Sequence, residues 1–134
     1  MQARAKPPMT VQLPLYDKTP DNEVLEGLPT SGWGKFTRYL EIATDRYVSR
    51  QIDWFENGYA LRYDREHYVD EFGMLGDLRY SEDWHQWWPN SVSIDQAEFE
   101  RVWSSAEHTP ALPLQIQSKE AASWPTVPPW LARK

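Results

Sequence analysis

The chain of 134 residues has no cysteine, so it can form no disulfide, hold no metal through thiolates and use no cysteine nucleophile. It also lacks any apolar run of about 18 residues, the length a membrane-spanning helix needs. Near the N-terminus Pro7 and Pro8 stand where a secretion signal would have an apolar stretch. We therefore expect a soluble, cytoplasmic protein without membrane insertion.

Proline is scarce in the middle of the chain. Of the eleven prolines only Pro89 lies between Trp33 and His108, whereas sixteen of the nineteen aromatic residues lie in that interval. The contrast predicts an extended Pro-rich N-terminal tail over 1–32, one globular domain over 33–108, and an extended Pro/Trp C-terminal tail over 109–134. Each tail is compatible with disorder or with docking, on this domain or on a partner.

Basic residues are also few in the predicted globular domain, which holds eight Lys and Arg against fifteen Asp and Glu. Such an acidic body disfavours nucleic acid and anionic membranes, because both are bound largely through positive charge. It suits a basic protein partner.

No catalytic or cofactor motif is present. The sequence has no phosphate loop, no nucleophile elbow and no calcium-loop spacing, and its histidines are scattered without zinc-type pairing: His67, His85 and His108. We expect no metal, no cofactor and no enzymatic activity. The enzymatic alternative is a small hydrolase or transferase that uses Arg50 with Asp64 or Asp70.

The strongest local signal is Asn57-Gly58 between two runs rich in aromatic and β-branched residues. It predicts a β-hairpin with a two-residue type I′ turn. In that register one face collects four apolar side chains, and Asp53 lies opposite Arg62 on the other. The four are Ile52, Trp54, Leu61 and Tyr63.

A further strand is predicted over Phe36–Ala43, joined to Tyr47–Phe55 by a three-residue loop. The fold class is therefore α+β, with an antiparallel meander of three strands, or four, and a C-terminal helix packed on one face. Arg38 and Arg50 fall on the apolar face. They either pack their aliphatic stems there, or are held by a carboxylate from Asp64, Glu66 or Asp70 and presented to a ligand.

Two helices are predicted after the irregular, acidic segment Asp64–Asp77. Ser81–Trp88 has a capping serine and ends before Pro89, and it carries three indoles at helical spacing, which suit either the core or an interface: Trp84, Trp87 and Trp88. Ile94–Glu107 has Asp95 as its N-cap and an apolar stripe that begins at Phe99.

Four segments of this region resemble a type of small, uncharacterised bacterial domain of immunity or accessory character. They lie within roughly residues 48–103: Val48–Gly58, Leu61–His67, Asp70–Leu75 and Asp95–Trp103. The resemblance implies a non-catalytic, partner-binding role and carries over no catalytic residue.

The sequence thus predicts a protein-interaction domain, acting as an accessory subunit or as an inhibitor of a larger partner. The alternative within this class is an immunity protein that neutralises a toxin. Five indoles are predicted to contact the partner: Trp84, Trp87, Trp88, Trp124 and Trp130.

Overall fold

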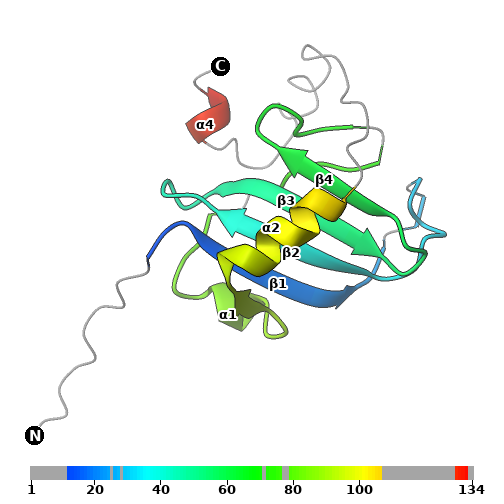
Figure 1. Ribbon diagram of the computed structural model, residues 1–134, viewed down its shortest axis with the longest axis horizontal. Helices are drawn as coiled ribbons and strands as arrows, with labels where there is room; N and C mark the ends of the chain where they lie inside the picture. The colour runs from blue at the N-terminus through cyan, green and yellow to red at the C-terminus, as the bar shows by residue number, and fades with distance from the viewer. Residues whose placement is uncertain are drawn as a thin grey trace, which may run out of the picture.

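A five-stranded antiparallel sheet forms the centre of the protein in the computed structural model (Figure 1). The structure describes residues 12–24, 26–27, 29–70, 72–76, 79–106 and 129–132. The strands are β1 (Leu15–Asn22), β2 (Phe36–Ile42), β3 (Val48–Phe55), β4 (Ala60–Asp64) and β5 (Val92–Ile94); the helices are α1 (Trp84–Trp87), α2 (Gln96–Ser105) and α4 (Pro129–Ala132).

The α+β class and the central meander are confirmed, but the sheet has more strands than the three or four expected. Its order is β4-β3-β2-β1-β5. The first added strand, β1, comes from the segment assigned to the N-terminal tail, and it lies between β2 and β5. The strand accommodates Pro20 because the β1–β2 ladder is irregular between Thr19 and Asn22, and Asp21 there has a φ of 58°.

The hairpin over β3 and β4 exists, but its predicted turn type and register are wrong. Trp54 pairs with Ala60, one residue off the expected partner, and of the two loop residues only Gly58 has a positive φ, of 97°. The loop therefore has three residues with the glycine in the left-handed position. It is fixed from outside, because the backbone N–H groups of Glu56 and Asn57 donate to carbonyl groups at 35 and 33.

The three-residue loop between β2 and β3 is confirmed, since Ala43 N donates to Tyr47 O at 2.9 Å. An irregularity between Glu41 and Ile42 then shifts the β2–β3 ladder by one residue. Arg38 consequently lies opposite Asp53, where the sequence suggested Ile52. A shift of one residue exchanges the faces of a strand, so the sheet presents different side chains on its two sides from those expected.

Helix α2 covers one face of the sheet (Figure 1). Its predicted N-cap is confirmed, because the Asp95 carboxylate accepts from Glu98 N at 2.8 Å. Phe99 is fully buried against Tyr16 and belongs to a cluster with Ile52 and Ala60. Removing one such side chain from water contributes about 2 kcal/mol, which fixes the helix on this face.

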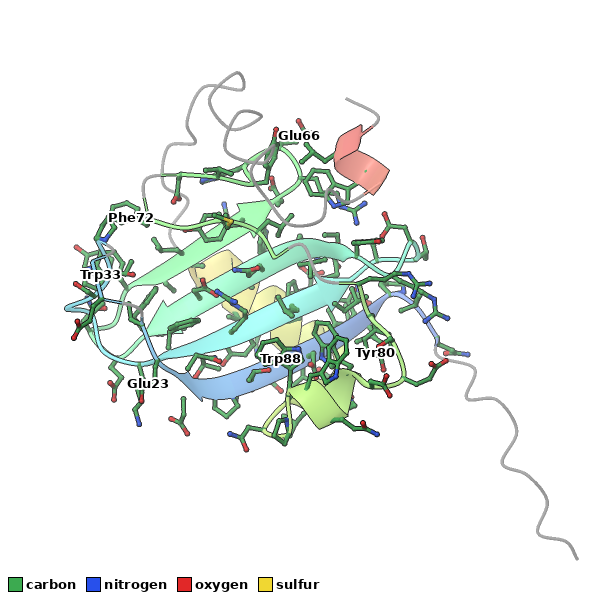
Figure 2. All side chains as sticks on the ribbon, turned by 180° about the vertical axis from the view of Figure 1, so that it is seen from behind. Glu23, Trp33, Glu66, Phe72, Tyr80 and Trp88 are labelled. Carbon is green, nitrogen blue, oxygen red and sulfur yellow. The ribbon has the colours of Figure 1, made fainter. Side chains whose placement is uncertain are left out.

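The opposite face of the sheet carries the larger core. It packs against the irregular segment 65–76 and against α1, and Figure 2 shows Tyr80 and Trp88 on this side. The buried residues of this cluster include Leu40, Leu61, Tyr63, Tyr68, Leu75 and Trp84. Within the described ranges, no helix is both long and apolar enough to cross a membrane.

Candidate functional site

Arg50 lies under α2, and its carboxylate partners are different from the predicted ones. Its Nη2 lies 2.6 Å from both Glu41 Oε2 and Glu100 Oε2, and its guanidinium stacks over the rings of Phe99 and Trp103 at 4.9 and 5.1 Å. These two carboxylates raise the pKa of Arg50. Arg50 is thus a clamp that joins β2 and β3 to α2.

Of the two acidic residues predicted beside Arg50, Asp64 lies opposite it in the β3–β4 ladder but uses its carboxylate to bind backbone groups, and Asp70 lies elsewhere. Asp64 Oδ1 accepts from the backbone N–H groups of Glu66 and His67 at 2.9 and 2.8 Å, so this carboxylate organises the turn after β4. Asp70 lies with the core of the opposite face, where it accepts from the Tyr63 hydroxyl at 3.0 Å. The structure does not bring Arg50, Asp64 and Asp70 together as one site.

Asp70 is the centre of a buried polar cluster of its own. His67 Nε2 lies 3.2 Å from Asp70 Oδ2, and the backbone N–H groups of Phe72 and Gly73 donate to Asp70 Oδ1 at 2.8 and 3.0 Å. Burial, followed by the nearby charge of Asp70, raises the pKa of Tyr63 well above its usual range. Tyr63 is therefore a neutral donor that stabilises the segment lying over the sheet.

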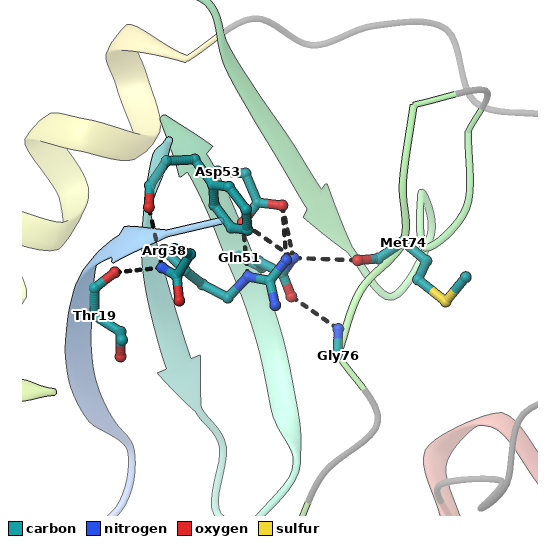
Figure 3. Close-up of polar contacts among 8 residues, drawn as sticks. Thr19, Arg38, Gln51, Asp53, Met74 and Gly76 are labelled. Carbon is teal, nitrogen blue, oxygen red and sulfur yellow. Dashed lines mark hydrogen bonds and ion pairs between the residues drawn. The ribbon is translucent and has the colours of Figure 1, made fainter. Parts of the chain in front are cut away.

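Arg38, Asp53 and Gln51 form a second polar network on this same face, shown in Figure 3. Arg38 Nε and Nη2 donate to the two carboxylate oxygens of Asp53 at 2.8 and 3.0 Å. Gln51 Nε2 lies 3.3 Å from each of the same oxygens. The Gln51 amide is itself held, because its Nε2 donates to the Met74 carbonyl at 3.1 Å and its Oε1 accepts from Gly76 N at 2.8 Å.

This network orients the Arg38 guanidinium. Asp53 and Gln51 are buried, whereas the Arg38 side chain is 37% exposed. Its Nη1 has no hydrogen-bond partner among the described residues. A guanidinium fixed through one edge by a buried carboxylate keeps its other edge available in a defined orientation.

A pocket of about 80 Å³ lies beside this guanidinium, between the sheet and α1. We call it the Arg38 pocket. Of the residues that the structure describes, Arg38 is the one charged residue in its lining, and two indoles form part of its wall. The lining includes Thr19, Arg38, Leu40, Gln51, Trp84 and Trp88.

The predicted contact indoles divide into buried and exposed groups. Trp84 is buried, and its Nε1 donates to Asp17 Oδ2 at 2.8 Å. Trp130 is also buried: it packs edge-on against Tyr68 at 5.4 Å. These two indoles are core side chains of the free protein. Trp124 lies outside the described residues.

Trp87 and Trp88 are the exposed pair. Trp87 is 58% exposed and is the last residue of α1. Trp88 is 37% exposed and directly follows the helix. The predicted helix is shorter than expected, with four residues, but it does place these two indoles at the surface.

Asp17 is a structural residue of this face that the sequence did not indicate. It is buried, and burial raises the pKa of its carboxyl group although the Trp84 indole opposes the shift. Through this bond Asp17 ties α1 to β1, and so it sets where the wall of the Arg38 pocket lies. A lone acidic residue between prolines carries no sequence signal for such a role.

No group of three His, Cys, Asp or Glu side chains suited to a metal ion occurs in the part of the chain that the structure describes. Comparisons of the chain with protein-family models, with curated proteins and with solved structures gave no match.

Proposed function

We propose that the protein is a non-catalytic interaction domain, an accessory subunit or inhibitor that binds a larger protein through the α1 surface. This surface consists of Trp87 and Trp88, together with the mouth of the Arg38 pocket. The observation that supports it most directly is the exposure of two neighbouring indoles at the end of one short helix. Exposed tryptophans are costly in water and are enriched among the residues that dominate protein interfaces.

The α1 surface is held rigidly by the residues around it. The Trp84 ring packs against Tyr80 and Trp88, with centroids 5.5 and 6.3 Å apart. Ser91 caps the end of the helix, because both its hydroxyl and its backbone N–H donate to the Trp88 carbonyl at 2.7 and 2.9 Å. A surface ordered before binding loses less conformational entropy on association, which favours a role in recognition.

Charge around α1 favours a basic partner. Glu82 and Asp83 are exposed immediately before the helix, and no Lys or Arg occurs between Arg79 and Arg101. The whole chain has a formal charge of −6. An acidic surface of this kind increases the association rate of a basic protein, and the indoles then provide the buried contact area.

The proposal is tested by capturing partners from the native host with matched variants. The wild-type protein and Tyr59→Ser are expected to recover the same protein, whereas Trp87→Ser/Trp88→Ser is expected to lose it. Tyr59 is a suitable control because it is also exposed but stacks on Trp33, away from α1.

The recovered protein is then purified, and its affinity is measured by calorimetry. We expect the double variant to bind at least about 30-fold more weakly, since an indole at the centre of an interface contributes about 2 kcal/mol. Equal binding by the double variant, or loss of binding in Tyr59→Ser as well, would contradict the proposal.

A further inference from the structure

We infer that the Arg38 pocket receives the side-chain carboxylate of an Asp or Glu residue from the protein partner. The inference rests on the proposed function and adds the chemistry of one contact. In the complex, Arg38 would bridge two carboxylates, Asp53 from its own chain and one from the partner.

Arg50 shows the same bridge in its completed form. Its Nε and Nη2 donate to Glu41 at 2.9 and 2.6 Å, and its Nη1 and Nη2 donate to Glu100 at 3.0 and 2.6 Å. Its guanidinium also stacks on aromatic rings. One arginine of this protein thus already holds two carboxylates at once, through two adjacent edges.

Arg38 has the first half of that arrangement. Its Nε and Nη2 donate to Asp53, and its guanidinium lies 5.0 Å from the centroid of the Phe36 ring. The edge that in Arg50 binds the second carboxylate has no hydrogen-bond partner at Nη1 among the described residues. Because Arg38 lines the pocket and no acidic side chain among the described residues does, this open edge suits an incoming carboxylate.

The size of the pocket favours a side chain over a small free metabolite. About 80 Å³ accommodates a carboxylate and the methylene groups next to it, whereas the rest of a ligand would lie outside. The surface outside is formed by exposed Trp87 and Trp88, which a protein surface can cover. The apolar neighbours Leu40 and Trp84 match the methylene groups of Glu.

The test uses a minimal probe of this side chain, N-acetylglutamate methylamide, and its neutral isostere N-acetylglutamine methylamide. Each is titrated into the ¹⁵N-labelled full chain, and the Trp88 indole and Arg38 Nε–H signals are followed by NMR. We expect saturable shifts with a dissociation constant in the millimolar range, and binding of the glutamate probe at least about tenfold tighter than that of the glutamine probe. Equal binding of the two probes, or no binding of either, would overturn the inference.

Variants show whether Arg38 is responsible. Arg38→Gln/Asp53→Asn removes the charge without leaving a buried carboxylate unpaired, and it is expected to weaken the glutamate probe at least about tenfold. Arg101→Gln removes the same charge from the exposed side of α2 and is expected to change binding less than twofold. A circular dichroism melt is used to check that each variant is folded. Should the double variant unfold, the affinity for the glutamate probe is measured instead with the single variant Arg38→Lys, which keeps the charge.

The outcomes separate this inference from the proposed function. Arg38→Gln/Asp53→Asn leaves the net charge of the chain unchanged, whereas Arg101→Gln lowers it by one. Similar weakening by both would show that binding does not depend on Arg38 in particular and would overturn the inference. If the captured partner depends on the two indoles while the Arg38 variants bind it as tightly as wild type, the interaction function stands and the carboxylate contact is refuted.

Discussion

Replacing Arg50 should reveal how strongly the clamp under α2 stabilises the fold. In Arg50→Met the aliphatic volume is kept, but Glu41, with a side chain only 14% exposed, loses its charged partner. Removing one member of a buried ion pair costs about 3–5 kcal/mol, and the lower end applies because Arg50 is 22% exposed and Glu100 is 42% exposed. We therefore expect the free energy of unfolding to fall by about 3 kcal/mol.

The measurement is urea unfolding followed by circular dichroism, with Glu100→Gln as the comparison. That variant removes the exposed carboxylate and should cost less than about 1 kcal/mol. Arg50→Met/Glu41→Gln should recover part of the loss, because the one carboxylate left without its partner is then Glu100, which is 42% exposed. If Arg50→Met were as stable as wild type, Arg50 would not be a clamp and the reasoning would fail.

The pH dependence provides a second check on the same residue. Although burial alone would raise the pKa of Glu41, its hydrogen bonds from Arg50 and Ser49 lower it in the folded state below the usual 4.5. The ionised carboxylate therefore stabilises the wild type above about pH 4.5, and this contribution is lost as the pH falls through the lowered folded-state pKa. The stability difference between wild type and Arg50→Met should accordingly shrink in acid.

Three other predictions concern separate parts of the fold, each measured as a free energy of unfolding. Asp17→Asn should stabilise the protein at neutral pH and should lose this advantage below pH 3.8, because burial raises the folded-state pKa of Asp17 and makes its ionisation unfavourable. Equal stability of the two proteins at every pH would contradict this. Gly34→Ala should cost at least about 1 kcal/mol more than Gly27→Ala. Both glycines have a positive φ, but only at Gly34 would the added Cβ lie 2.6 Å from a carboxylate oxygen of the hairpin loop. Equal costs would show that the hairpin loop moves to make room for the Cβ. Trp130→Ala should cost about 3 kcal/mol, since its ring is buried against the domain, and an unchanged stability would show that this contact is not formed in solution.

The parts of the fold that the sequence predicted correctly depend on local chemistry. The N-cap at Asp95 and the buried Phe99 of α2 follow from residues within one helical turn. The loop between β2 and β3 follows from the alternation of apolar residues, and its left-handed position is Arg46, with a φ of 74°. In both cases the signal and the structure lie in the same short segment.

The errors in the predicted fold arise from contacts between residues that lie far apart in the sequence. The hairpin turn is altered by hydrogen bonds to the backbone near Lys35, and these exist only once the sheet has formed. Two of the prolines that made 1–32 look like a tail are tolerated because Pro14 directly precedes β1 and Pro20 coincides with its irregularity. Propensity and spacing do not contain such tertiary contacts.

The candidate site was partly visible in the sequence. Arg38 was recognised as a charged residue on an apolar face and as a residue that a carboxylate could hold for a ligand. Its partner was misassigned because the predicted register paired Asp53 with Arg62, whereas the observed ladder places Asp53 opposite Arg38. A one-residue shift of the register therefore explains why the arginine was predicted correctly and its carboxylate partner was not.

The position of β1 within the sheet has a consequence for synthesis of the chain on the ribosome. β1 emerges early and can pair with β2 soon afterwards, but its other edge has no partner until β5, roughly seventy residues later, has been translated. During that interval the nascent sheet exposes an edge that could recruit a second chain. Pro20, which has no N–H to donate, and the left-handed Asp21 follow the part of β1 that pairs with β5, so they limit the length of strand that another chain could extend before Val92–Ile94 is made.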